Sequence, residues 1–172
     1  MNLTTKDFIE NLNFEYFESY SFQRKGDFEI YENLLNKYKK DRSSLLEEEA
    51  MVFEKLRNSK LYTKDNNFIF LENGNLNETA ELIYKSAAQT NVNEKLIEIL
   101  KTTFVDYDAW MCAPTYRDAI LFYDSKGNIV NGLNICFQCS NVIDLNKKEI
   151  LTDNIAYKKL KEFLSEIGHN IN

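Results

Sequence analysis

Three cysteines are the side chains of this sequence best suited to chemistry. Cys136 and Cys139 form a C-x-x-C pair, and Cys112 precedes them in the run Cys112-Ala113-Pro114. Thiolates are nucleophiles and metal ligands, so such a group can form a disulfide, exchange disulfides or hold zinc. Three interpretations stay open: buried structural thiols, disulfide chemistry between Cys112 and Cys139, and a zinc site with Cys136 as a further ligand. The first of these needs no cofactor.

A predicted β-hairpin places these thiols. The residues Ser125-Lys126-Gly127-Asn128 are typical of its turn. If the first and last of these four residues face each other, the strand register places Asp118 opposite Ile135 and, further along, Pro114 opposite Cys139. Pro114 cannot donate a ladder hydrogen bond, so an irregularity is expected near it.

The same register gathers two of the sulfurs. Cys112 lies two positions before Pro114 and shares its face. Cys112 and Cys139 are therefore expected to be diagonal neighbours, with Cα atoms roughly 7–8 Å apart. That separation is just beyond the usual reach of a disulfide, and a bulge would be needed to close it. Cys136 lies an odd number of positions from Cys139, so in a regular strand it points to the other face.

Three polar residues complete the candidate site. Tyr116, Arg117 and Asp118 lie between Pro114 and the predicted hairpin. Adjacent strand residues point to opposite faces, so Arg117 and Asp118 are not a simple ion pair. Arg117 could contact an anion or pair with a neighbouring strand, and a hydrolase or transferase that uses Asp118 and Arg117 is a further alternative. The candidate binding residues are Cys112, Tyr116, Arg117, Asp118 and Cys139.

Histidine chemistry has little support in the sequence. There is no G-x-S-x-G nucleophile motif and no H-E-x-x-H zinc motif. The single histidine is His169, close to the end of the sequence, where chains usually fray. A mechanism that needs a histidine base is therefore not expected.

The elements that must position these residues indicate one α+β domain over residues 1–172. Helical patterns come first, then an antiparallel meander, then a closing helix, which is the order of an α+β fold. We expect an antiparallel sheet over about 109–137, extended by an edge strand at 141–145. We expect helices to cover one face of this sheet at 44–58, with a capping box at Ser44 and Glu47, at 77–104, and at 153–167, between Asp153 and Gly168.

The N-terminal part carries mixed signals. Phe8, Leu12 and Tyr16 recur at helical spacing, whereas Gln23–Asp27 is typical of a turn. For residues 5–38 we therefore expect a short helix followed by a β-hairpin around Gly26.

Composition narrows the function classes. The 172 residues are 44% apolar, which is enough for a core. Asp and Glu outnumber Lys and Arg by 27 to 21, a net charge of −6. A nucleic-acid binder is therefore not expected, and a protein partner would be basic. No signal peptide or membrane-spanning stretch is visible, which predicts a cytoplasmic protein whose thiols stay reduced.

Several runs of the sequence resemble a family. They are Cys112-Ala113-Pro114, then Phe122-Tyr123-Asp124, then Ile135-Cys136-Phe137-Gln138-Cys139, and a closing helix that ends near Gly168. This pattern, over residues 110–168, resembles a family of small bacterial proteins with no known activity. The resemblance implies the fold and the site but no reaction. Many members are lipoproteins or secreted, and many carry a histidine beside the proline, where this chain has Tyr116 and Arg117. That departure weakens a histidine-assisted thiol or metal role.

These observations favour a non-enzymatic binding or interaction module of the immunity or accessory type. The alternative is a thiol-redox or zinc protein that uses Cys112, Cys139 and Cys136.

Overall fold

The computed structural model describes residues 3–41, 45–59, 61, 67–106 and 113–171. It divides into two compact units. Residues 1–21 together with 81–172 form what we call the sheet unit, and residues 22–80 form the helical unit. The helical unit is thus inserted between two strands of the sheet unit. This division is finer than the single domain expected over 1–172, which stays a prediction.

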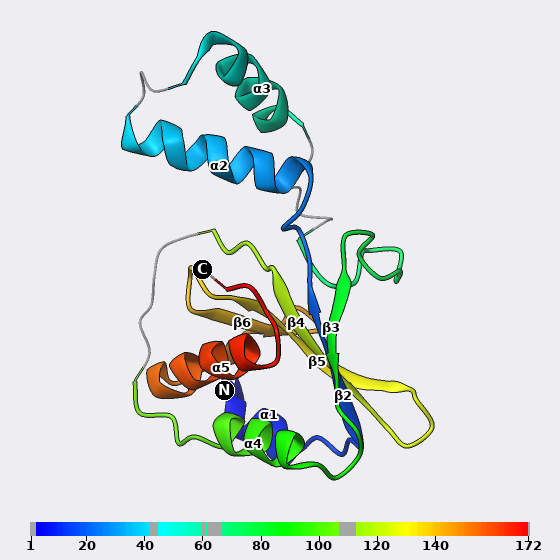
Figure 1. Ribbon diagram of the computed structural model, residues 1–172. Coiled ribbons are helices and arrows are strands. Elements are labelled where there is room, and N and C mark those ends of the chain that lie inside the picture. Colours follow the sequence, from blue (N-terminus) through cyan, green and yellow to red (C-terminus); the bar gives the residue numbers. More distant parts are fainter. Residues whose placement is uncertain (1–2, 42–44, 60, 62–66, 107–112, 172) are drawn as a thin grey trace. The chain divides into compact units, whose positions relative to one another are not determined.

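A five-stranded antiparallel sheet organises the sheet unit, which confirms the predicted α+β fold (Figure 1). Its strand order is β3-β2-β4-β5-β6. The strands are β2 (Tyr16–Ser21), β3 (Glu81–Lys85), β4 (Asp118–Tyr123), β5 (Ile129–Cys136) and β6 (Asn141–Asp144). Two short strands, β1 (Leu3–Thr4) and β7 (Ile150–Leu151), form a separate parallel pair.

The β4–β5 hairpin has the predicted register over Asp118–Phe122, where Asp118 faces Ile135 and Ile120 faces Leu133. Beside the turn the pairing shifts by one residue: Tyr123 faces Ile129, and the Asp124 amide donates to the Asn128 carbonyl, so the expected pairing of Ser125 with Asn128 is wrong. The ladder ends at Asp118, so residues 113–117 do not form the strand expected from residue 109, and residues 109–112 lie outside the described part. The expected pairing of Pro114 with Cys139 is therefore not part of the sheet. A proline that cannot donate to a ladder is consistent with this early end.

Three helices cover one face of the sheet, which we call the inner face (Figure 1). They are α1 (Thr5–Glu10), α4 (Asn91–Leu100) and α5 (Asn154–Glu166). Alternate strand residues point towards them, because side chains alternate between the faces of a sheet. The core between the layers includes Phe17, Leu96, Ile120, Phe122, Leu133, Ile135, Leu160 and Phe163.

Two of the expected helices are placed differently. In the segment 77–104, Glu81–Lys85 is strand β3, and only its second half is helical, as α4. Ser19 on β2 faces Tyr84, so a partner distant in sequence makes this stretch a strand. The helix expected at 44–58 is present as α3 (Glu47–Arg57), and it belongs to the helical unit.

The helical unit is built around α2 (Asp27–Lys40) and α3. Phe53 on α3 stacks against Tyr31 and Tyr38 of α2, with ring centroids 5.4 Å apart in each pair. Gly26, at a φ of 62°, precedes α2 directly. The β-hairpin expected around Gly26 is therefore wrong: its first strand is β2, and a helix follows the glycine.

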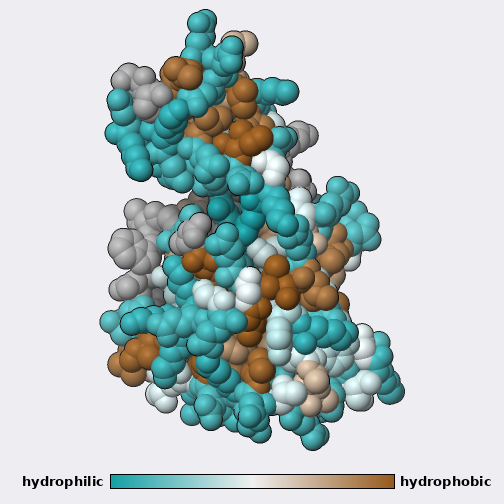
Figure 2. Space-filling view, in the orientation of Figure 1, coloured by the Kyte–Doolittle hydropathy of each residue, from teal (hydrophilic) through white to brown (hydrophobic). Residues whose placement is uncertain are grey.

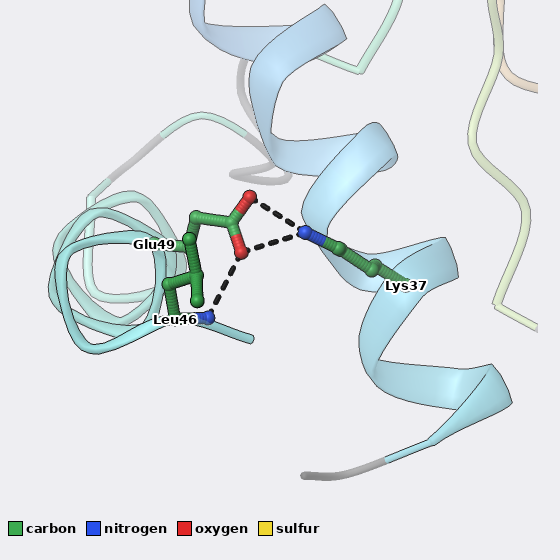
Figure 3. A network of polar contacts seen from close by, with 3 residues as sticks. All are labelled: Lys37, Leu46 and Glu49. Atoms are coloured by element: carbon green, nitrogen blue, oxygen red, sulfur yellow. Dashed lines mark hydrogen bonds and ion pairs between the residues drawn. The ribbon is translucent and has the colours of Figure 1, made fainter. Parts of the chain in front are cut away.

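A carboxylate holds the start of α3. Glu49 accepts the Leu46 amide at 2.9 Å and the Lys37 ammonium at 2.7 Å (Figure 3). The helix begins at Glu47 and its N-cap is Leu46. The capping-box glutamate is therefore Glu49 and not the expected Glu47. Ser44 lies outside the described residues.

The visible surface is mostly hydrophilic, with separate apolar patches (Figure 2). Among the described helices, none combines the length and the hydropathy that a membrane span requires.

Candidate functional site

Asp118, one of the predicted site residues, begins β4 and is 1% exposed. It shares the inner face with Ile120 and Phe122, because these residues alternate along the strand. On the neighbouring strand β2, Ser21 faces Asp118 and Ser19 faces Ile120. Ser19 and Asp118 are therefore diagonal neighbours on one face of the sheet.

His169 reaches this face because of the way in which α5 ends. Gly168 adopts a φ of 111°, its amide donates to Ser165 and the His169 amide donates to Leu164. These two hydrogen bonds form a Schellman motif, which reverses the chain direction after a helix. The predicted end of the helix at Gly168 is confirmed. The expectation that His169 frays is wrong, since its side chain is 0% exposed.

The three side chains form a continuous hydrogen-bonded network. The Nδ1 atom of His169 lies 2.7 Å from Asp118 Oδ1, and its Nε2 atom lies 2.9 Å from Ser19 Oγ. A carboxylate only accepts hydrogen bonds, so Nδ1–H donates to Asp118, and in the neutral imidazole Nε2 then accepts the Ser19 hydroxyl proton. This is the order of contacts in a serine-hydrolase triad.

The network is nevertheless closed to a substrate. Ser19 is 0% exposed and lies between the sheet and its helices. A nucleophile must come within about 3 Å of the reacting atom, so a substrate could not reach its hydroxyl without opening the core. Strand β2 also lies inside the sheet, between β3 and β4. In the folded state these residues satisfy one another and hold the C-terminal segment against the sheet.

The cysteines differ in state. Cys139 is disulfide-bonded, whereas Cys136 is a free thiol, 1% exposed. The Cys139 amide donates to the Cys136 carbonyl at 3.4 Å, so the two residues share a tight turn, and the Cys139 sulfur lies 3.7 Å from the Ala113 carbonyl oxygen. Cys112 lies outside the described residues, and its pairing with Cys139 stays a prediction.

The described residues add no further ligand to the zinc site considered at the cysteines. Within the described residues, no group of three or more His, Cys, Asp or Glu side chains is placed to hold an ion. Zinc binds a thiolate, so Cys139 could join Cys136 at a metal only after its disulfide is reduced.

The other predicted residues are engaged in the fold. The Tyr116 hydroxyl donates to Asn141 at 2.6 Å, and Asn141 donates in turn to Glu149. Burial raises the pKa of Tyr116, so its hydroxyl stays protonated at neutral pH. Arg117 donates its amide to Ile135 and is half-buried. The Tyr116 hydroxyl is therefore engaged with Asn141 of β6, whereas Asp118 is engaged with His169.

A second polar cluster, which the sequence did not reveal, lies on the outer face of the sheet, the face that α1, α4 and α5 do not cover. Its centre is Glu18 on β2, whose side chain is 10% exposed. The Lys85 ammonium contacts Glu18 at 2.8 Å, and the Tyr20 hydroxyl donates to it at 2.6 Å. Tyr16 and Tyr123, which face each other across β2 and β4, stack with centroids 4.8 Å apart.

The hydrogen bonds of this cluster stabilise the charged form of the Glu18 carboxylate. Burial by itself would raise the pKa of Glu18, but hydrogen bonds from Lys85, Tyr20 and Tyr123 bring it below its ordinary value. Burial and the hydrogen bond to Glu18 raise the pKa of Tyr20 to about 12. Glu18 is therefore charged and Tyr20 is neutral at physiological pH.

Comparison with protein families, curated proteins and solved structures finds no match. The function must therefore be argued from the geometry. Sequence reasoning missed Ser19, His169 and Glu18, because each depends on strand pairing between segments far apart. The one available signal was Gly168, which predicts a chain reversal and so the return of His169.

Proposed function

We propose that this protein is a non-enzymatic interaction module of the immunity or accessory type, and that its partner is a basic protein. The observation that carries the proposal is the location of the charge. Residues 22–80 contain ten Lys or Arg and eleven Asp or Glu, whereas the rest of the chain contains eleven and sixteen. Five of the six net negative charges thus belong to the sheet unit. Such a surface attracts a basic partner and speeds its association.

The sealed Ser19–His169–Asp118 network supports the non-enzymatic part of the proposal. Its residue types suit catalysis, but its burial suits a structural role. A fluorophosphonate probe, which reacts with activated serines, tests this part. We expect no modification of Ser19 in the native protein by mass spectrometry, and modification there would overturn it.

The binding part is tested with the full chain and a library of peptides that contain lysine, glutamate or neutral residues at matched positions. We expect measurable binding to lysine-containing peptides at physiological salt, with an association rate that falls as salt rises. Equal binding to acidic and neutral peptides, or no binding at all, would contradict the proposal.

A second candidate function follows from the state of the cysteines. Cytosolic disulfides are rare and are usually transient and redox-linked, whereas oxidising compartments stabilise structural ones. The disulfide at Cys139 therefore fits the predicted cytoplasmic location only if it is redox-active. In that function, the Cys136 thiolate attacks the Cys139 sulfur, a Cys136–Cys139 disulfide forms, and the former partner sulfur leaves as a thiolate. No net oxidation occurs.

Differential alkylation distinguishes these alternatives. Free thiols are alkylated in the native state, and the remaining ones are labelled after unfolding with a second reagent and located by mass spectrometry. For a thiol-exchange protein we expect the native label at more than one cysteine. If Cys136 is the one cysteine found as a free thiol and reacts only after unfolding, the disulfide at Cys139 is structural and this candidate is removed.

A further inference from the structure

The Glu18 cluster has the chemistry of a cation-binding site that a residue of this chain already fills. Lys85 places its ammonium 2.8 Å from the Glu18 carboxylate and 4.7 Å from the centroid of the Tyr16 ring. A carboxylate beside an aromatic face is the arrangement that recognises ammonium and guanidinium groups. Lys85 thus shows which ligand class the site accepts.

The two halves of this contact differ in exposure and in their other contacts. The Glu18 side chain is 10% exposed, and the hydroxyl of Tyr20 anchors it, whereas the Lys85 side chain is 55% exposed. Lys85 ends β3, which is an edge strand of the sheet. A long, exposed side chain leaves an ion pair at little cost. The carboxylate cannot follow it, so a departing Lys85 leaves a fixed, charged acceptor behind.

The surroundings suit a protein surface. Leu82 faces Tyr20 across β2 and β3, and Ile129 faces Tyr123 across β4 and β5, so both lie on the outer face beside the cluster. Their exposures are 51% and 41%. A charged centre rich in tyrosine, flanked by exposed apolar side chains, has the composition of an interaction hot spot.

We propose that the Glu18 carboxylate and the Tyr16 ring form the receptor for a lysine side chain of a partner protein, and that Lys85 occupies this receptor in the unbound protein. Binding exchanges one ammonium group for another while Lys85 moves into solvent. This inference rests on the proposed interaction function and names the site that performs it. While Lys85 fills the site, a partner lysine cannot bind. The apparent dissociation constant therefore equals the intrinsic one divided by the fraction of time for which the site is vacant.

The test compares the full-length wild type with Lys85→Met, which vacates the site but keeps an unbranched apolar stem. The probes are the peptide acetyl-Gly-Gly-Lys-Gly-Gly-amide and its analogue with norleucine in place of lysine. Binding is followed by the NMR shifts of the tyrosine rings. We expect the lysine peptide to bind Lys85→Met about tenfold more tightly than the wild type, as for a site that is vacant about a tenth of the time.

Three controls make the result specific. Lys95→Met removes a lysine that pairs with Glu166 elsewhere on the surface, and should bind as the wild type does. Glu18→Gln in the Lys85→Met background should abolish binding. If that variant does not fold, Tyr16→Leu in the same background keeps the carboxylate and should weaken binding about threefold. The norleucine peptide should not bind to any variant.

Equal affinity of the wild type and Lys85→Met, or equal binding of the norleucine peptide, would overturn the inference. The proposed interaction function is tested separately, by the peptide library. If the library experiment yields a lysine-selective ligand whose affinity is unchanged in the Glu18→Gln variants, the module binds basic partners at another site, and only the receptor assignment is wrong.

Discussion

At the scale of single residues, the inner face of the sheet carries a polar network in an otherwise apolar core. Asp118, Ser19 and His169 are each less than 5% exposed, and each contact between them is a hydrogen bond of ordinary length. Buried polar groups cost free energy unless they are paired, so the three residues depend on one another. The histidine is the link that joins the other two.

Replacing His169 should therefore destabilise the fold. His169→Ala removes a partner of Asp118 and of Ser19, and we expect the free energy of unfolding to fall by about 2–3 kcal/mol. Ser19→Ala, which removes one hydroxyl, should cost about 1 kcal/mol. Urea denaturation measures both. Asn170→Ala, at the exposed next position, is the control and should change little. A His169→Ala value within 0.5 kcal/mol of the control would show that the network does not stabilise the fold.

At the scale of elements, one carboxylate joins a helix to a distant loop. Asp153 caps α5 through the Ile155 amide at 2.8 Å and also accepts the amides of Val105 and Asp106. Burial by itself would raise the pKa of Asp153, but these backbone hydrogen bonds bring it below its ordinary value of 3.8. The folded protein therefore binds a proton at this position less readily than the unfolded chain does.

This linkage predicts a pH dependence. A lowered pKa in the folded state gives stability that is present above about pH 4 and is lost as the pH falls through the folded-state value. Asp153→Asn cannot titrate and loses the charge that strengthens these hydrogen bonds, so its deficit relative to the wild type should be constant, at about 1 kcal/mol, above pH 5. The deficit should shrink as the pH falls below 4. Chemical denaturation of both proteins from pH 7 to 2.5 measures it, and a constant deficit throughout would contradict the assignment.

A glycine permits the close packing of the central hairpin. A Cβ atom at Gly132 would lie 2.7 Å from Leu121 Cδ2 and 2.8 Å from the Ile120 carbonyl oxygen. The carbonyl belongs to a paired strand and cannot move away cheaply. We expect Gly132→Ala to destabilise the protein by about 1–3 kcal/mol in thermal or urea unfolding. Val130→Ala, at a position that is 38% exposed on the same strand, should cost far less, and similar losses for both would contradict the steric explanation.

At the scale of the whole molecule, the two units differ in how deeply they bury apolar side chains. Of the twelve largest fully buried side chains among the described residues, ten belong to the sheet unit, and only Phe22 and Ile69 belong to the helical unit. Burial of apolar surface is the main source of stability. The sheet unit should therefore be the last part to open.

Hydrogen exchange with site resolution tests this order. Amides of β2, β4 and β5 should exchange only through global unfolding, whereas those of α2 and α3 should exchange through openings of lower free energy. Equal protection of the two units at all denaturant concentrations would show instead that they unfold together. That outcome would support the single domain that the sequence predicts.

The sequence by itself determined whatever depends on residues close together in the chain. The turn residues at 125–128 mark the β4–β5 hairpin, although the pairing beside the turn differs by one residue from the expected one, and Asp153 and Gly168 set the ends of α5. Local backbone preferences and short-range hydrogen bonds act before any tertiary contact forms, so these features are visible in the sequence. The acidic charge is likewise a property of composition.

Only the tertiary structure decided which distant residues share a face. Glu81–Lys85 is a strand because β2 pairs with it, although the intervening 59 residues form another unit. His169 meets Ser19 across nearly the whole sequence, and Glu18 is held by Lys85 of β3, which follows β2 in the chain only after the helical unit. Such contacts form where the sheet order brings strands together, and local patterns do not encode that order. Both polar clusters of this protein therefore became visible only with the fold.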